Sequence, residues 1–126
     1  MNRNYILRDT IIFGKDIPSY SDICHFNGLN LDQLKQLINS EFIELDECQN
    51  DSPTTQEIYD FMKKYPDYTA HGYVVTINRK DYRTTLEGVE KRSGFDSKQE
   101  CNEFHKLFGS ADELIIDEDN IYCWYD

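Results

Sequence analysis

The sequence predicts a single α+β domain over residues 1–126, with an antiparallel sheet of about four to six strands and about three helices. Three segments place apolar residues at helical spacing behind residues that cap helices. Other, shorter segments are rich in β-branched and aromatic residues and are separated by short polar turns, which is typical of antiparallel hairpins. A length of 126 residues suits one domain with its own hydrophobic core.

Each predicted helix begins at a residue whose side-chain oxygen can accept a hydrogen bond from the first turn, followed three residues later by Glu or Gln. These pairs are Asn30 with Gln33, Thr54 with Glu57, and Ser97 with Glu100. We expect the first helix over residues 30–42. An alternative start for the second is Ser52 with Pro53 at the first helical position, and Tyr65 ends it because a residue before proline avoids the helical region. Gly109 ends the third.

Strands are predicted where β-branched and aromatic residues are concentrated. These segments are 71–77, 82–87, 113–117 and 120–125. The first two flank a polar turn and predict a hairpin, and we expect residues 5–7 and 10–13 to add one or two further strands. In the last segment Ile121, Cys123 and Tyr125 alternate with Tyr122 and Trp124, so the strand is apolar on both faces. Such a strand either lies inside the sheet or presents aromatic side chains to a partner.

The formal net charge is −11, and it is unevenly distributed. Residues 1–62 and 93–126 are strongly acidic, whereas residues 63–92 carry more Lys and Arg than Asp and Glu. An acidic surface repels phosphate backbones and anionic lipid, so we expect no direct binding to nucleic acid and none to membranes. The same surface attracts basic proteins, which makes a basic protein the expected partner.

Cysteine usage and the N-terminus predict a cytoplasmic protein. The four cysteines are too widely spaced for a disulfide scaffold, and the first residues lack the apolar stretch of a secretory signal. Twelve Ile and nine Asn beside only two Ala are typical of an AT-rich genome, such as that of a low-GC bacterium, its phages or its mobile elements.

No motif predicts a metal, a cofactor or a catalytic centre. Cys101 and His105 share a helical face, but zinc sites usually bring paired ligands at closer spacing, so we expect no metal here. The acidic turns lack the central Gly of a calcium-binding EF-hand loop. None of the six glycines forms a phosphate-binding loop. We therefore expect a protein that is not an enzyme.

These observations predict a small acidic binding module that blocks a basic surface of a nucleic-acid-binding protein or a toxin, as anti-restriction, anti-CRISPR and immunity proteins do. The expected contact residues combine the C-terminal carboxylates with the terminal aromatic side chains. They are Asp112, Glu113, Asp117, Glu118, Asp119, Tyr122 and Trp124. The alternative is a small enzyme or ligand sensor with a pocket that involves His71, His105 and Cys101. A homodimer joined through the terminal strand is a third interpretation.

Overall fold

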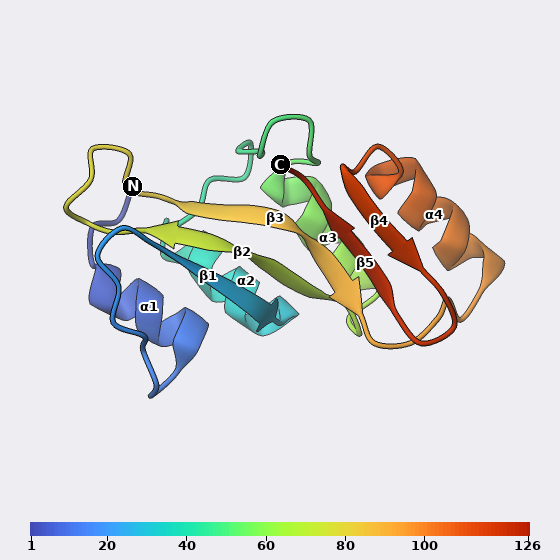
Figure 1. Cartoon of the computed structure of the whole chain (residues 1–126), viewed down its shortest axis with the longest axis horizontal. Helices are drawn as coiled ribbons and strands as arrows, with labels where there is room; N and C mark the ends of the chain where they lie inside the picture. The colour runs from blue at the N-terminus through green and yellow to red at the C-terminus, as the bar shows by residue number, and fades with distance from the viewer.

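The structure, a computed structural model, describes all 126 residues and confirms the predicted α+β fold with an antiparallel sheet. It contains four helices and five strands (Figure 1). In chain order they are α1 (Tyr5–Phe13), β1 (Ile23–Leu29), α2 (Leu31–Asn39), α3 (Thr55–Lys64), β2 (Thr69–Val75), β3 (Thr84–Lys91), α4 (Lys98–Phe108), β4 (Glu113–Ile116) and β5 (Ile121–Trp124).

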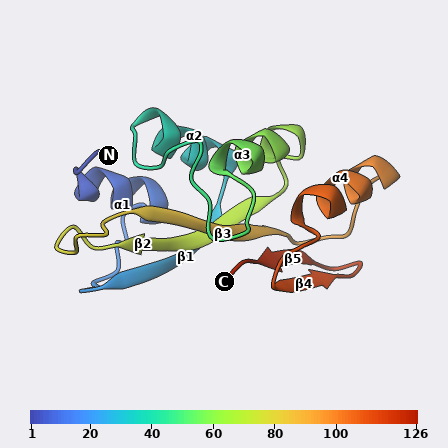
Figure 2. The same ribbon diagram turned by 90° about the horizontal axis from the view of Figure 1, so that it is seen from above.

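The five strands form one sheet in the order β1-β2-β3-β5-β4, with every neighbouring pair antiparallel. All four helices lie on the same side of this sheet, as the view in Figure 2 shows. The molecule therefore has two layers, and no helix covers the second face of the sheet.

The three helices predicted from their caps are present. Asn30 and Gln33 form a reciprocal capping box at α2, and Thr54 and Glu57 form another at α3. Ser97 caps α4 by accepting a hydrogen bond from the backbone N–H of Glu100. The Glu100 carboxylate does not return to Ser97, however, because it enters the interior and accepts a hydrogen bond from Lys91.

The prediction of strands at residues 5–7 and 10–13 is wrong, because this segment forms α1. Asn4 caps the helix by accepting a hydrogen bond from the Leu7 N–H. The fully buried Arg8 side chain then holds α1 against the sheet by donating to the carbonyl oxygens of Val75 and Arg83. These long-range contacts override the local preference of β-branched residues for strands.

β1 is a strand that the sequence pattern does not reveal. Its pairing with β2 shifts register between Phe26 and Leu29, where Gly28 adopts a φ of 65°. A bulge of this kind breaks the alternation of apolar and polar residues by which a strand is recognised in a sequence.

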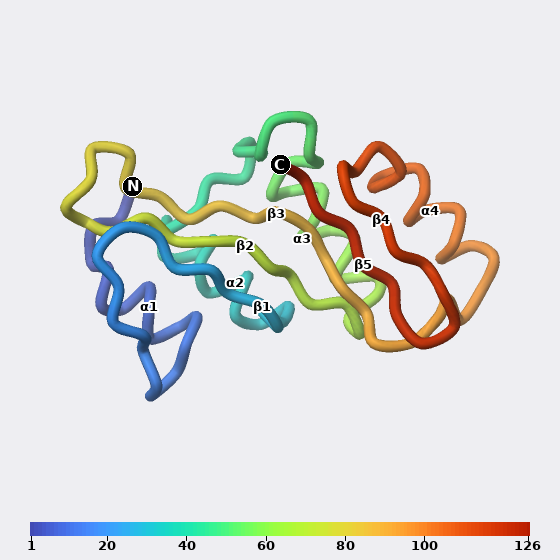
Figure 3. The backbone as a smooth tube through the Cα atoms, viewed as in Figure 1, coloured from blue at the N-terminus to red at the C-terminus, as the bar shows by residue number.

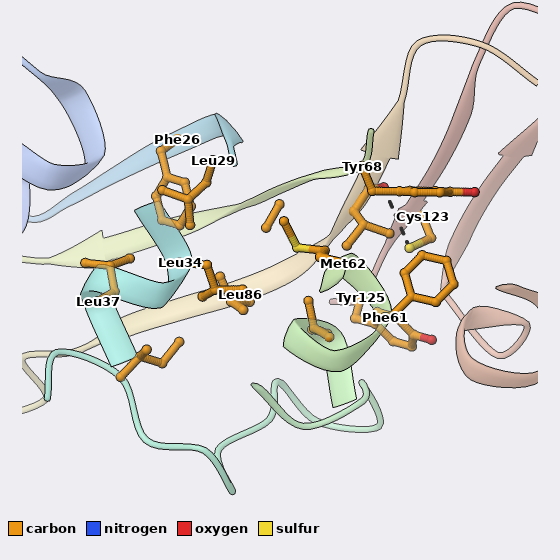
Figure 4. Close-up of a cluster of buried hydrophobic side chains, with 14 of the residues drawn as sticks. Phe26, Leu29, Leu34, Leu37, Phe61, Met62, Tyr68, Leu86, Cys123 and Tyr125 are labelled. Carbon is orange, nitrogen blue, oxygen red and sulfur yellow. Dashed lines mark hydrogen bonds between the residues drawn. The ribbon is translucent and has the colours of Figure 1, made fainter. Parts of the chain in front are cut away.

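The hydrophobic core lies between the helices and the sheet. Figure 4 shows Leu34 and Leu37 of α2 and Phe61 and Met62 of α3 packed over side chains from the strands. The predicted alternation in the C-terminal segment is confirmed: Ile121, Cys123 and Tyr125 are buried, whereas Tyr122 and Trp124 are only half-buried. β5 lies inside the sheet between β3 and β4, and the chain ends beside the loop that precedes α3 (Figure 3).

Candidate functional site

The candidate site lies on the face of the sheet that no helix covers. Side chains at alternate strand positions point to this face. His25 of β1 and Tyr73 of β2 are register partners there, with ring centroids 5.7 Å apart. Toward β5 the same face carries His71, Glu87, Glu90, Tyr122 and Trp124, which line a depression of about 360 Å³ together with His25.

His71 reaches from β2 across β3 to β5. Its Nε2 lies 2.8 Å from the carbonyl oxygen of Cys123, and its ring stacks on Tyr122 with a centroid separation of 4.9 Å and an interplanar angle of 9°. Since a carbonyl oxygen only accepts hydrogen bonds, Nε2 carries the proton and Nδ1 is left as an acceptor. No protein group is hydrogen-bonded to Nδ1.

Burial lowers the pKa of His71 below its ordinary value. The hydrogen bond to the Cys123 carbonyl and the charges of Glu87 and Glu90 act in the opposite direction but do not offset it. His71 is therefore a neutral acceptor at neutral pH.

A β-bulge and one glycine make this crossing possible. The β2–β3 pairing shifts register between His71 and Gly72, so that Glu87 is the extra residue of a bulge in β3. Gly88 lies beneath the His71 side chain. A Cβ atom there would stand 2.0 Å from the Cys123 carbonyl oxygen and 2.8 Å from His71 Nε2, so only glycine fits.

Glu87 is a buried carboxylate that lines the depression. Its side chain is only 9% exposed. One carboxylate oxygen accepts a hydrogen bond from the indole N–H of Trp124 at 3.2 Å, and the other lies 3.5 Å from Nδ1 of the exposed His25. No Lys or Arg side chain forms an ion pair with it.

The residues predicted to bind a partner fall into two groups. Tyr122 and Trp124 line the depression. The five carboxylates lie instead at the two ends of β4, the edge strand of the sheet. Asp112 and Glu113 are at its start, and Asp117, Glu118 and Asp119 form the turn at its end, where the Asp117 carboxylate accepts hydrogen bonds from the backbone N–H groups of Asp119 and Asn120.

Between these carboxylates β4 is apolar and exposed. Leu114, Ile115 and Ile116 are each 37–43% exposed, and the outer edge of the strand has no neighbour in the sheet (Figure 1). We refer to β4 with its flanking carboxylates, residues 112–119, as the acidic edge.

The alternative pocket of His71, His105 and Cys101 is not assembled. Cys101 and His105 lie on α4, where His105 Nδ1 is 2.9 Å from the Cys101 carbonyl oxygen and 3.6 Å from its sulfur. His71 lies on the other face of the sheet and lines the depression without them. No group of three or more His, Cys, Asp or Glu side chains is placed to hold a metal ion.

The thiols of Cys123 and Cys24 are not activated as nucleophiles. Burial raises the pKa of Cys123 to about 12 and raises that of Cys24 as well, so both remain protonated at neutral pH.

Sequence reasoning missed His25 and Glu87 as residues of the site. Their side chains meet only because β1 and β3 both flank β2, which is a non-local pairing. The available signal was a pair of glycines, Gly72 inside the predicted strand 71–77 and Gly88 directly after the predicted strand 82–87, since glycines in strands mark bulges and close approaches of the backbone.

Fold and site together define a two-layer α+β protein with an uncovered face and an acidic edge. Comparison with protein-family models, curated proteins and solved structures finds no significant match. No helix has both the length and the apolar character needed to cross a membrane.

Proposed function

We propose that this chain is a protein-binding module that takes a basic partner along the acidic edge and thereby blocks a surface of a nucleic-acid-binding protein or toxin. The observation that supports this proposal best is an apolar edge strand with carboxylates at both ends. Leu114, Ile115 and Ile116 are exposed between the 112–113 pair and the 117–119 turn.

An edge strand offers unpaired backbone N–H and C=O groups to a strand of another chain, and exposed apolar side chains add to the contact. A second copy of this chain is a poor occupant. Antiparallel pairing of β4 with itself would place the 112–113 carboxylates of one copy opposite the 117–119 carboxylates of the other, and like charges repel. A basic segment meets the same carboxylates with opposite charge.

The basic side chains of this chain leave its acidic surface largely uncompensated. Arg79 forms ion pairs with Asp22 and Asp81, and Arg83 also contacts Asp81. The buried Arg8 and Lys91 pair with Asp9 and Glu100 inside the fold. The net charge of −11 therefore resides on exposed carboxylates. Their electrostatic field attracts basic proteins to the surface.

The test is an affinity pull-down from nuclease-treated host lysate, followed by binding measurements with the purified partner at low and moderate salt. We expect a stoichiometric basic protein that salt releases. The triple variant Glu113→Lys, Glu118→Lys and Asp119→Lys should weaken binding by about tenfold, since three exposed ion pairs contribute roughly 0.5 kcal/mol each.

A matched control carries the same change in net charge elsewhere on the surface. Asp16→Lys, Glu44→Lys and Asp51→Lys alter three exposed carboxylates outside the acidic edge. The control should bind almost as tightly as the unmodified protein. Equal losses in both triple variants would mean that only net charge matters, and unchanged binding in the edge variant would refute a role for β4; either result overturns the proposal.

A further inference from the structure

The depression on the uncovered face holds a buried carboxylate that lacks a basic partner. Asp9, Glu87 and Glu100 are the only buried acidic residues of the chain. Asp9 is paired with Arg8 at 2.9 Å, and Glu100 is paired with Lys91 at 2.9 Å. The Glu87 carboxylate accepts a hydrogen bond only from the indole N–H of Trp124, and the exposed His25 lies 3.5 Å from it.

Removing a carboxylate from water is costly unless a cation and further hydrogen bonds compensate for the lost hydration. Asp9 and Glu100 satisfy this requirement within the fold. The Arg92 side chain also lines the depression, yet it is 87% exposed and lies 3.7 Å from Glu90, so it does not serve Glu87. A counter-ion for Glu87 must therefore come from another molecule.

The surroundings of Glu87 indicate which cation fits. Tyr122 and Trp124 supply aromatic surfaces, Glu90 adds a second carboxylate, and the unpartnered Nδ1 of His71 is a further acceptor. A guanidinium group is planar, donates five hydrogen bonds and stacks on aromatic rings, whereas an ammonium is a compact and strongly hydrated charge. A depression of about 360 Å³ is within the range of ligand pockets.

We propose that this depression is a binding site for a guanidinium group, with Glu87 as its counter-ion. The site is distinct from the acidic edge, because none of the edge carboxylates lines the depression. The guanidinium comes either from an arginine side chain of another protein or from a small molecule, and both present the same chemistry to Glu87.

The test is an NMR titration that follows the indole N–H signal of Trp124, which is hydrogen-bonded to Glu87. The probes are Nα-acetyl-arginine methylamide, which imitates an arginine within a chain, n-butylguanidine as a small molecule with the same single charge, and Nα-acetyl-citrulline methylamide as the neutral isostere. We expect saturable shifts with at least one guanidinium probe and at least about tenfold weaker binding of the citrulline probe. Preference for the blocked arginine indicates a protein side chain as the natural ligand, and preference for n-butylguanidine indicates a small molecule.

Glu87→Gln should weaken guanidinium binding by at least about tenfold, because the amide keeps an oxygen for the Trp124 N–H but loses the charge. Glu44→Gln makes the same change of charge at an exposed residue outside both the depression and the acidic edge, and it should bind normally. Equal binding of the arginine and citrulline probes, or equal effects of the two variants, would overturn the proposal. If Glu87→Gln does not fold, the comparison of probes on the unmodified protein decides. Binding to the acidic edge is measured separately by its own triple variant, so either proposal can fail without the other.

Discussion

At the scale of single residues, the titratable side chains inside this protein differ in whether a partner of opposite charge offsets their loss of hydration. Arg8 and Lys91 each have a carboxylate partner and additional hydrogen bonds, and each fastens a helix to the sheet. His71 is half-buried without a carboxylate contact, and its environment favours the neutral form. These differences lead to two predictions about stability.

Glu100 is the residue on which the Lys91 interaction depends. It accepts hydrogen bonds from Lys91, from the Tyr68 hydroxyl and from the Asp96 N–H. Glu100→Gln should reduce the free energy of unfolding by about 3–5 kcal/mol, since it leaves a buried ammonium without its main counter-charge. Replacing both partners, Lys91→Met with Glu100→Leu, should recover most of this loss, and urea unfolding of the two proteins measures the difference.

The pH dependence of this pair has a defined sign. Burial lowers the pKa of Lys91, but hydrogen bonds to Glu100 and Asp96 outweigh it and raise the pKa above its ordinary value. The contribution of Lys91 to the free energy of unfolding is therefore fully present below the unfolded pKa of about 10.4 and is lost as the pH rises through the folded value.

If the double variant Lys91→Met with Glu100→Leu unfolds as readily as Glu100→Gln, this account of the pair is contradicted.

The half-buried His71 predicts that the stability of the protein falls at acidic pH. Its pKa is lower in the folded protein than the unfolded value of about 6.5, so the unfolded chain takes up the proton first and stability falls as the pH drops below that value. His71→Gln keeps an N–H donor for the Cys123 carbonyl but does not titrate. Urea unfolding at about pH 7.5 and pH 5.5 should show a smaller loss for His71→Gln than for the unmodified protein. Identical losses in His71→Gln and the unmodified protein would refute the role of His71.

At the scale of elements, the bulge in β3 organises the uncovered face. It places Glu87 beside Trp124, and it lets the His71 side chain cross the sheet over a backbone that has no Cβ atom. The same region joins the two halves of the sheet, since β3 pairs with β5 only at Glu90 and Lys91 and the Glu87 carbonyl accepts a hydrogen bond from the Tyr125 N–H. A small change of backbone here should affect both stability and the site.

Gly88→Ala tests this arrangement. The new methyl group would collide with the Cys123 carbonyl oxygen at 2.0 Å, so β3 and β5 must separate and the His71 hydrogen bond must break. We expect a loss of about 1–3 kcal/mol in the free energy of unfolding, together with a shifted Trp124 indole signal. Gly94→Ala is the control, because its nearest contact would be 3.3 Å. Equal stability of the two variants would show that the sheet tolerates the side chain.

At the scale of the whole molecule, the two-layer architecture leaves one face of the sheet without a covering helix. The depression lies on the uncovered face and is lined by residues of β1, β2, β3 and β5, whereas the acidic edge is formed by β4, the neighbour of β5 at the rim of the sheet (Figure 1). The acidic net charge acts over the whole surface, but the two proposed sites differ in what they offer. The edge presents apolar side chains and backbone groups, whereas the depression presents one buried carboxylate among aromatic rings.

The sequence by itself determined the features that depend on neighbours along the chain. The caps at Asn30, Thr54 and Ser97 and the alternation in 121–125 are local patterns, and the structure confirms them. The net charge and the positions of the acidic turns are likewise properties of the sequence. Local hydrogen bonds and side-chain periodicity suffice for these features, because they involve residues only a few positions apart.

Only the tertiary structure decided that residues 5–13 form α1, that residues 23–29 form β1, and which residues line the depression. α1 is held by Arg8 contacts to residues about 70 positions away, and the bulge at Gly28 hides β1 from a periodic pattern. Glu87 and His25 meet because two strands happen to flank a third, and Glu87 lacks a counter-ion only when all of its neighbours are in place. The physical reason is that strand pairing and burial are long-range, so a charge that looks ordinary in the sequence becomes distinctive only in the folded chain.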